Sequence, residues 1–319
     1  MKRVLVTGGT GFIGRAIVEK NIQDGNIVTV LDNNSRGSIA KLAHLSDEIS
    51  FIQGDIRDPE IVNMATKNID QVIHLAYING TEYFYSRPYD VLDVGIRGIL
   101  NILDSHKTNH FSELIVASTS ETYQNAAQIP TPEEVALVVP DVLNPRFSYG
   151  GGKIATELLA VNYARQNELG VKIFRPHNIY GPDMGYEHVI PQLIRKIRSA
   201  QMPGTKKCRI TIQGDGSETR SFCFIQDFIN GFATVLNDQS HLSVYHLGVN
   251  DEISILNLIE RIGKILKVDV EVESGELLEG SPTRRSPDIS KIEKLGFTQK
   301  YSLEQGLEPT ISWYLENPK

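Results

Sequence analysis

The sequence predicts an α/β fold, a doubly wound parallel sheet with a smaller α/β part intertwined with it. In the first half of the chain, short apolar runs rich in β-branched residues alternate with segments of helical periodicity. This alternation is the pattern of a parallel sheet covered by helices on both faces. The composition is that of an ordinary globular protein, with 40% hydrophobic and 22% charged residues among 319.

The expected sheet has a strand for each apolar run in the first 176 residues. These runs cover residues 3–8, 27–32, 49–55, 71–76, 113–119 and 171–176. Helices are expected over residues 12–24, 91–106 and 150–167, so that right-handed crossovers join the strands. Residues 1–176 are therefore expected to form the first domain, with a returning segment near 223–250 whose residues 243–249 rejoin the sheet.

Beyond Pro176 the alternation loosens, and residues 177–319 are expected to form the smaller, substrate-binding part. Helices are expected over 188–200 and 251–266, and strands over 268–274 and on both sides of a glycine turn within 208–222. No low-complexity linker separates the two parts, so we expect them to be intertwined.

The sequence argues against several classes of protein. No apolar run reaches the ~18 residues of a membrane span, and glycines interrupt the N-terminus before a signal-peptide core forms. Cys208 and Cys223 match neither a disulfide scaffold nor a zinc site, so we expect two reduced thiols, no metal and a cytoplasmic protein. The net charge of −7 argues against nucleic acid as a partner but leaves a small anionic ligand possible.

A glycine-rich turn, GGTGFIG, lies between the first strand and the first helix. Gly9, Gly11 and Gly14 fit G-x-G-x-x-G, and Gly8, Gly11 and Gly14 fit the wider G-x-x-G-x-x-G. Glycine allows the positive φ of such a turn and lets a dinucleotide's pyrophosphate approach the backbone at the helix N-terminus. A turn without a ligand is the alternative, but the strand before and the helix after favour a Rossmann dinucleotide site.

An acidic residue ends the second strand. Asp32 lies 18 residues after Gly14, where a carboxylate binds the adenosine ribose hydroxyls and repels a 2′-phosphate. NAD is therefore the expected cofactor, although Arg36 leaves open a pairing with the 2′-phosphate of NADP. Asp55, which ends the third strand, is either an adenine contact or a plain turn residue.

Tyr149 and Lys153 stand four residues apart in SYGGGK, at the expected start of a helix. That spacing puts both side chains on one helix face. A phenol with a pKa of about 10 is a poor base, but a nearby ammonium favours the phenolate, so Tyr149 can take a proton from a substrate hydroxyl. A surface pair is the alternative, and the preceding glycine turn and strands favour the catalytic interpretation.

Polar residues follow the fifth strand in the segment ASTSETY. The carboxyl ends of such strands open into a ligand crevice, so Thr119 is expected to bind the same substrate hydroxyl as Tyr149. Glu121 is a candidate general acid, general base or hydroxyl acceptor, with an exposed loop carboxylate as the alternative. His74 lies in an apolar strand and is expected to be a core histidine.

These motifs together resemble the NAD-dependent epimerase/dehydratase family of extended short-chain dehydrogenases/reductases, over essentially the whole chain. The matching pieces are VTGGTGFIG, LDN, GDIRD, HLA, ASTSETY, SYGGGK, FRPHNIYGP, GDGSETRSF and RRSPDISK. The resemblance implies cofactor contacts at Gly8, Gly11, Phe12, Ile13, Gly14, Asp32, Asn33, Asp55, Ile56, Leu75, Ala76, Tyr149 and Lys153. It also implies a nucleotide-sugar diphosphate held by Asn178, Arg220 and Arg285, and guanidinium forks suit phosphates.

Some positions depart from the family's usual pattern. Gly95 stands where N-V-x-G-T places an asparagine, so the contact of that asparagine is lost. Gln124 stands where a glycine is usual, and His177 replaces a common aromatic residue. The segment 77–88 is unusually aromatic and carries Glu82. These differences lie around the expected sugar pocket, so substrate identity does not follow from the resemblance.

The resemblance implies a shared first step, in which Tyr149 takes the proton of a sugar hydroxyl, usually at C4, and NAD⁺ takes the hydride. We expect epimerisation to follow, because it needs least beyond Tyr149, Lys153 and Thr119. A 4,6-dehydratase usually presents two acids as T-D-E, where this chain has T-S-E. A UDP-glucuronate-type decarboxylase using Glu121 and Arg285 remains open, as do a 4-keto reductase and a non-catalytic NAD-sensing regulator.

The expected partners are a nucleotide-diphosphate sugar and a second copy of the chain. The helices over 91–106 and 150–167 carry more apolar residues than one sheet-facing stripe needs. These residues are Ile99, Leu100, Ile102, Leu103, Leu158, Leu159, Val161 and Tyr163. In resembling enzymes the two helices pair across a two-fold axis, so a homodimer is expected.

Overall fold

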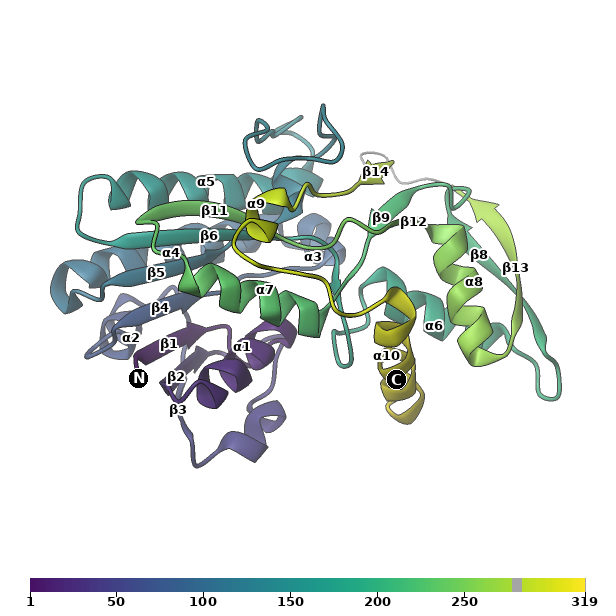
Figure 1. The fold of residues 1–319 in the computed structure, drawn as a ribbon, viewed down its shortest axis with the longest axis horizontal. Helices are drawn as coiled ribbons and strands as arrows, with labels where there is room; N and C mark the ends of the chain where they lie inside the picture. The colour runs from purple at the N-terminus through teal and green to yellow at the C-terminus, as the bar shows by residue number, and fades with distance from the viewer. Residues whose placement is uncertain (277–282, 319) are drawn as a thin grey trace. The chain divides into compact units, whose positions relative to one another are not determined.

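The computed structural model describes residues 1–276 and 283–318 (Figure 1). The chain divides into two units, each of which is described by itself. The first unit comprises Met1–Gln124, Leu137–Pro176 and Ala233–Tyr245, and the second comprises Asn125–Ala136, His177–Phe232 and His246–Lys319. Within the described ranges, no helix combines the length and the apolar character that crossing a membrane requires.

A seven-stranded sheet dominates the first unit, and its order is β11-β6-β5-β4-β1-β2-β3. The strands are β1 (Arg3–Thr7), β2 (Ile27–Asp32), β3 (Ile49–Gln53), β4 (Gln71–His74), β5 (Glu113–Ala117), β6 (Gly170–Pro176) and β11 (Leu242–Leu247). Neighbours from β3 to β6 pair in parallel. The doubly wound α/β class is confirmed, and β11 is the strand expected to rejoin the sheet. The winding direction reverses between β1 and β4, where the crevice of such sheets opens.

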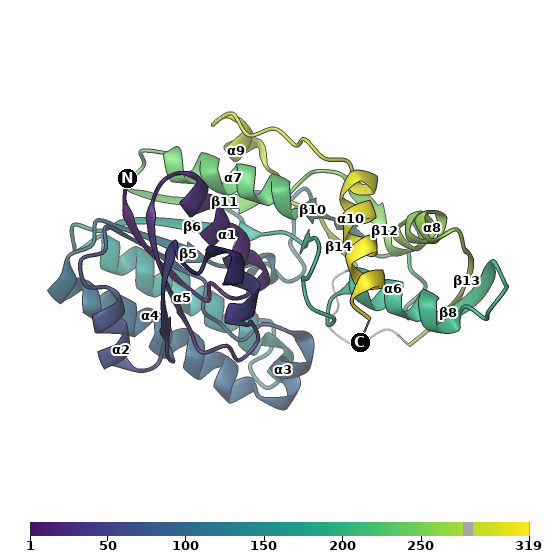
Figure 2. The ribbon, with the colours of Figure 1, turned by 90° about the horizontal axis from the view of Figure 1, so that it is seen from below.

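Helices cover both faces of this sheet. They are α1 (Phe12–Gln23), α2 (Pro59–Ala65), α3 (Thr81–Ser86), α4 (Pro88–Asn109) and α5 (Ser148–Ala164), with 3₁₀ turns at Ile39–Leu45, Ser120–Thr122 and Pro145–Phe147. α2, α4 and α5 lie on one face and α1 lies on the other (Figure 2). Apolar side chains of the strands and of α4, such as Leu5, Val72 and Ile99, form a buried core beneath the first group.

The second unit consists of helices around small sheets. Its helices are α6 (Val189–Ala200), α7 (Ile225–Asn237, whose last turn belongs to the first unit), α8 (Ile255–Leu266), α9 (Ser290–Glu293) and α10 (Leu303–Glu316). Its strands are β7 (Ile179–Tyr180), β8 (Lys207–Gln213), β9 (Thr219–Ser221), β10 (Cys223–Phe224), β12 (Glu252–Ser254), β13 (Asp269–Gly275) and β14 (Arg284–Arg285). The two strands expected within 208–222 exist as β8 and β9, but they join different sheets, because β8 pairs with β13 and β9 lies between β12 and β14.

A buried ion pair ties α5 to β6 in the first unit. The guanidinium of Arg175 donates to both carboxylate oxygens of Glu157 over 2.9 and 2.6 Å, and the two residues are 4% and 5% exposed. The Ser118 hydroxyl, just beyond β5, donates to the same carboxylate. Arg175 also lies over the ring of Tyr123 and donates to its hydroxyl. One charge network therefore fixes α5 to the ends of β5 and β6.

Replacing Glu157 by glutamine is expected to destabilise the protein by about 3–5 kcal/mol, because the Arg175 guanidinium would stay buried without its counterion. Chemical denaturation at neutral pH measures the change. Glu168→Gln, at an exposed position after the same helix, is the control and should change little. A loss below about 1 kcal/mol for Glu157→Gln, the scale of a surface pair, would contradict the assignment.

Candidate active site

The glycine turn between β1 and α1 has the geometry that a pyrophosphate needs. Gly8 has a φ of 74°, and a Cβ atom at Gly14 would lie 2.1 Å from the carbonyl oxygen of Gly8. Gly11 is the N-cap of α1 and provides no side-chain cap for the first turn, which begins with Phe12 and Ile13. The first-turn N–H groups and the positive end of the helix dipole suit phosphate oxygens, so the turn fits a dinucleotide.

Asp32 connects this turn to the loop after β2. Its carboxylate accepts the backbone N–H groups of Thr10 over 3.0 Å and of Asn34 over 2.8 Å. In the same loop the side chain of Asn33 accepts the N–H of Ser35 over 3.0 Å. A carboxylate has about four lone-pair sites, so Asp32 retains acceptors for ribose hydroxyls.

Asp55 and Ile56 follow β3. The guanidinium of Arg57 lies 2.8 Å from the Asp55 carboxylate and lowers the pKa of that group through its hydrogen bonds. Asp55 is therefore a partner of Arg57 in the protein itself, which the sequence interpretation did not include. Ile56 is buried, and its side chain lies against Gly98 of α4.

The end of β4 lies beside the glycine turn through the hydroxyl of Thr7. That hydroxyl accepts the N–H groups of Leu75 and Ala76, each over 3.2 Å, and lies 2.9 Å from Nδ1 of His74. Burial lowers the pKa of His74 to about 3. His74 is therefore a neutral core histidine, as its apolar surroundings in the sequence indicate.

Tyr149 and Thr119 meet in the first unit. Tyr149 lies in the first turn of α5 and is 6% exposed. Burial raises the pKa of its phenol, while a hydrogen bond with the Thr119 hydroxyl and the charge of Arg36 lower it. Gln124, where a glycine is usual, adopts a φ of 51°, so the chain keeps the left-handed conformation that explains the usual glycine.

Lys153 lies one helical turn after Tyr149 and is 3% exposed. Its ammonium donates to the carbonyl oxygen of Ala117 at the end of β5 over 2.6 Å. The ammonium also lies 4.0 Å from the centroid of the Tyr77 ring. Burial lowers the pKa of Lys153 to about 7, and the charge of Glu157, one turn further along α5, raises it.

Two aromatic rings enclose the phenol of Tyr149. Phe84 of α3 stacks on it with centroids 4.8 Å apart and an interplanar angle of 9°. Tyr77 meets it edge-on at 5.3 Å and 84°. Both rings come from the aromatic segment 77–88, whose composition was the signal in the sequence, although no role for either ring followed from it.

Glu121 is neither exposed nor alone. Its carboxylate lies 2.9 Å from a guanidinium nitrogen of Arg146, and the side chains are 18% and 10% exposed. Arg146 also lies over the Phe84 ring at 5.6 Å from its centroid. The alternative of an exposed loop carboxylate is therefore wrong. Arg146 was missed in the sequence, where its place three residues before Tyr149 was the available signal.

The residues expected to bind a diphosphate gather in the second unit. The parallel pairing of β14 with β9 puts Arg285 opposite Arg220. The side chain of Asn178 donates to the carbonyl oxygen of Ser221, the next residue of β9, over 3.0 Å. The hydroxyls of Ser221 and Ser286 are hydrogen-bonded over 3.0 Å. The segments around 178, 220 and 285 are thus held together.

Lys153→Met is expected to stabilise the protein most below about pH 7, where the wild-type lysine is charged in both states and the folded protein carries the full cost of burying it. From about pH 7 to the ordinary lysine pKa of about 10.4, only the unfolded chain holds the proton, so wild-type stability rises with pH. The gain in unfolding temperature should therefore shrink over this range. Lys264→Met, at an exposed lysine, is the control, and a pH-independent gain would contradict the assignment.

Known proteins resemble this chain over nearly its full length. The chain is 31% identical to UDP-N-acetyl-alpha-D-glucosaminuronate decarboxylase of Bacillus cytotoxicus, over 99% of this chain and 98% of that one. The structure of UDP-N-acetylglucosamine 4-epimerase from Methanobrevibacter ruminantium M1 matches with a TM-score of 0.88 and 26% identity, covering 99% of both chains. A dTDP-glucose 4,6-dehydratase from Streptomyces venezuelae with NAD bound matches with a TM-score of 0.87 and 26% identity, over 99% and 97%.

The names of these relatives give three different reactions. What the relatives share is the family and its cofactor. The sequence model of the NAD dependent epimerase/dehydratase family matches residues 4–248, which contain the glycine turn, Asp32, Tyr149 and Lys153. The chain therefore belongs to the NAD dependent epimerase/dehydratase family and is an enzyme that uses NAD.

Proposed function

We propose that the enzyme is a nucleotide-sugar 4-epimerase, with Tyr149 as the base and Lys153 as its electrostatic partner. The observation that carries the proposal is the buried phenol of Tyr149, hydrogen-bonded to Thr119 and one helical turn from Lys153. When bound, NAD supplies a hydride acceptor that can return the hydride to either face of the sugar. The glycine turn, Asp32 and the residues after β3 and β4 would hold it in the first unit.

The protein's own residues would transfer one proton from the sugar hydroxyl and back to it. Tyr149 is protonated at rest, because burial raises the pKa of its phenol. To act as a base, the phenol must first release its own proton to solvent. As a phenolate it then takes the proton of the sugar hydroxyl, which becomes a far stronger acid as its carbon loses hydride. The hydrogen bond from Thr119 and the ammonium of Lys153 stabilise that phenolate. When the hydride returns, Tyr149 gives the proton back to the new hydroxyl.

The state of Glu121 favours epimerisation over dehydration. A dehydratase needs an acid that protonates the leaving hydroxyl and a base that removes a carbon-bound proton, besides the tyrosine. The carboxylate of Glu121 is paired with Arg146, and an ion-paired carboxylate is a poor proton donor. Epimerisation needs no acid or base other than Tyr149.

Decarboxylation of a UDP-uronate is the second candidate. The Bacillus cytotoxicus relative is named as a uronate decarboxylase at 31% identity, and T-S-E with a later R-x-P, which contains Arg285, resembles that group. Oxidation at C4 would make the uronate a β-keto acid, which loses carbon dioxide without a protonated leaving group. Glu121 can therefore remain paired in this reaction as well.

In both reactions the second unit would bind the nucleotide diphosphate. Arg220 and Arg285 lie opposite each other on paired strands, and the Asn178 side chain is anchored to β9. Two guanidinium groups suit two phosphates, because each can pair with oxygens in a bidentate manner. We propose this unit as the substrate part of the chain.

A panel of UDP-sugars distinguishes the reactions. The NAD-loaded enzyme is incubated with UDP-glucose, UDP-N-acetylglucosamine and their uronates, and products are identified by mass spectrometry and NMR. A new stereoisomer of unchanged mass, with no net NADH absorbance, supports the epimerase. Loss of carbon dioxide from a uronate supports the second candidate, and loss of water or accumulation of NADH contradicts both.

Tyr149→Phe should lower kcat by ~10²–10⁴-fold, the usual cost of losing a general base, while nucleotide-sugar binding persists. Phenylalanine keeps the stacking on Phe84, so folding should be unaffected. Turnover and substrate affinity are measured separately, with Tyr89→Phe, at an exposed tyrosine, as the control. Near-normal turnover would mean that another group is the base, and Glu121 would be tested next.

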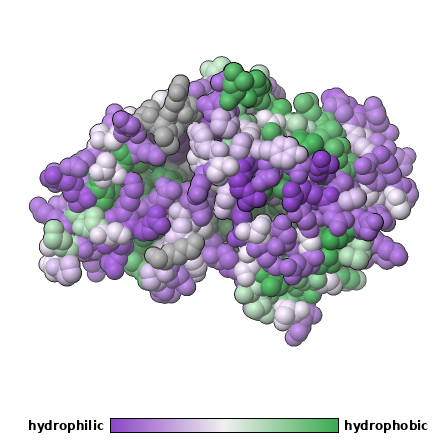
Figure 3. All heavy atoms as spheres, turned by 180° about the vertical axis from the view of Figure 1, so that it is seen from behind, coloured by the Kyte–Doolittle hydropathy of each residue, from purple (hydrophilic) through white to green (hydrophobic). Residues whose placement is uncertain are grey.

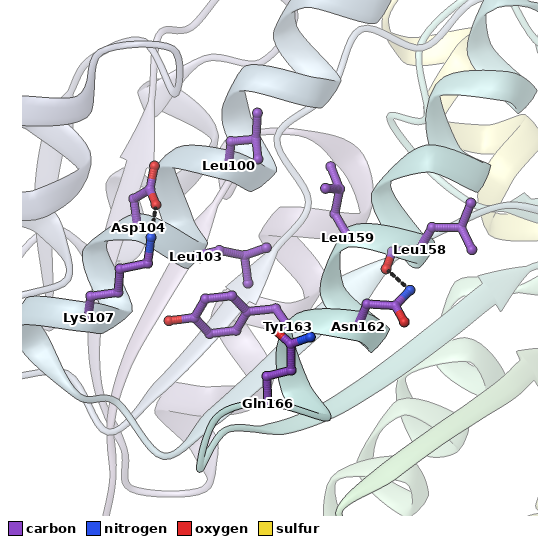
Figure 4. A pocket seen from close by; sticks show the side chains of 9 residues that line it. All are labelled: Leu100, Leu103, Asp104, Lys107, Leu158, Leu159, Asn162, Tyr163 and Gln166. Carbon is purple, nitrogen blue, oxygen red and sulfur yellow. Dashed lines mark hydrogen bonds and ion pairs between the residues drawn. The ribbon is translucent and has the colours of Figure 1, made fainter.

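We also propose that the enzyme is a homodimer through α4 and α5. A groove of about 430 Å³ lies between these helices, and its leucines, Leu100, Leu103, Leu158 and Leu159, line it from both sides (Figure 4). Leu158 is 58% exposed and Leu100 39%, whereas Ile99 and Ile102, also expected at the interface, are buried in the core. Hydrophobic patches interrupt the polar surface in Figure 3. A two-fold contact between the same helices of two copies would cover these leucines.

Leu158→Glu is expected to convert the dimer to a monomer, because it introduces a charge into the apolar centre of the contact. Light scattering at micromolar concentration gives the mass. Leu315→Glu, at a leucine of α10 that is 42% exposed, is the matched control and should leave the dimer intact. A wild-type chain that is already monomeric would overturn the proposal.

A further inference from the structure

We propose that Tyr77 positions the charged form of Lys153 with the face of its ring, and that its hydroxyl is dispensable. We further infer that residues 95 and 152 are glycines because this ring occupies the space beside them. The inference rests on the proposed role of Lys153 in catalysis, and it assigns a function to a residue outside the Tyr149–Lys153 pair.

The ring of Tyr77 takes the place of water around the Lys153 ammonium. The nitrogen lies 4.0 Å from the ring centroid and donates to the carbonyl oxygen of Ala117 over 2.6 Å. Lys153 is 3% exposed, so this cation–π contact is desolvated, and such contacts are strongest away from water. The same ring packs at 84° to the ring of Tyr149, with centroids 5.3 Å apart, so Tyr77 contacts both members of the proposed catalytic pair.

Two glycines on different helices create the space for this ring. A Cβ atom at Gly95 of α4 would lie 2.3 Å from each of three atoms of Tyr77, namely Cε2, Cζ and the hydroxyl oxygen. A Cβ atom at Gly152 of α5 would lie 2.2 Å from the same oxygen. An alanine side chain at either position would require the ring of Tyr77 to move. Gly95, a position where the sequence indicated only a lost asparagine contact, therefore makes room for the ring that contacts Lys153.

The hydroxyl of Tyr77 contributes little to this arrangement. It is buried and, in the part of the chain that the structure describes, has no hydrogen-bond partner. Burial raises the pKa of this phenol, so it is neutral. An unsatisfied buried hydroxyl costs free energy, which leaves the ring as the useful part of the side chain.

The ring of Tyr77 contributes an important part of the stabilisation of the Lys153 charge, because of the state of the other groups that face Lys153. From α5 this is Glu157, with Tyr149 one helical turn before Lys153, and from β4 it is His74. His74 and Tyr149 are neutral, the first because its pKa falls to about 3 and the second because burial raises its pKa. Glu157 is charged but holds Arg175 over 2.6 Å.

Tyr77→Phe and Tyr77→Leu separate the ring from the hydroxyl. Tyr77→Phe should keep kcat/KM within about 3-fold of wild type, because the ring face remains. Tyr77→Leu should lower it ~10-fold at neutral pH and move the alkaline limb of the pH profile down by about one unit, because the lysine loses its proton at lower pH without the ring. A merely structural loss would lower activity without moving the limb.

Alanine substitutions test the space. Gly152→Ala should lower activity, and Tyr77→Phe should restore it in the double variant, because the nearest remaining atom is Cδ2 of Leu92 at 3.2 Å. Gly95→Ala should not be rescued by Tyr77→Phe, because ring carbons remain 2.3 Å away. Gly151→Ala is the matched control, since its nearest contact is a methyl of the exposed Val139 at 3.3 Å.

A stability measurement keeps the inference separate from the proposed function, because it requires no substrate. Lys153→Met is introduced into the wild type, Tyr77→Phe and Tyr77→Leu, and unfolding is measured from about pH 6 to about pH 10. The low-pH gain from Lys153→Met should be larger in Tyr77→Leu than in the other two, because the charged lysine there has lost its ring. Equal gains in all three, or an unshifted pH limb in Tyr77→Leu, would overturn the inference even if the enzyme is an epimerase. Inactivity on UDP-, dTDP-, GDP- and CDP-sugars alike would overturn the proposed function alone.

Discussion

One positive charge, held away from water, organises the candidate active site. The ammonium of Lys153 has a backbone carbonyl at the end of β5, the face of Tyr77 and the nearby carboxylate of Glu157 in place of solvent. Burying a charge is costly unless such partners are supplied. The end of β5, the aromatic segment 77–88 and α5 each provide one of these partners. In the proposed mechanism the phenolate of Tyr149 depends on the same charge, because a buried phenolate also requires a compensating partner.

α5 sets the spacing of these groups. Tyr149, Lys153 and Glu157 follow at four-residue intervals on one face of the helix, and Arg175 binds the last of them from β6. The third residue of the series therefore fixes the first two. Its ion pair with Arg175 holds α5, and with it Tyr149 and Lys153, at the carboxyl ends of β5 and β6. A helix held only by apolar contacts could slide or rotate more readily, because such contacts have little directionality.

In the proposed mechanism, the first chemical step and its outcome depend on different residues of the first unit. Removal of the proton from the C4 hydroxyl would need only Tyr149, Lys153 and Thr119. The fate of the keto sugar depends on what surrounds the rest of the substrate. Here Glu121 is neutralised by Arg146, and aromatic rings enclose Tyr149. Such a site suits a reaction that reuses one base, and it is less suited to one that needs an additional acid.

The sequence by itself determined the features that depend on neighbours along the chain. The glycine turn, Asp32 at a strand end and the four-residue spacing of Tyr149 and Lys153 are local patterns, and strand–helix alternation predicted the doubly wound sheet for the same reason. Only the tertiary structure decided the partners. Glu121 is paired with Arg146, Glu157 with Arg175 and Lys153 with Tyr77. The members of these pairs lie 25, 18 and 76 residues apart in the sequence, and no periodicity relates them. Gly95 illustrates the difference. The sequence indicated a missing asparagine side chain there, and the fold places the ring of Tyr77 in that space. The volume around a residue is set by segments that are distant in the chain, so the sequence alone could not show this.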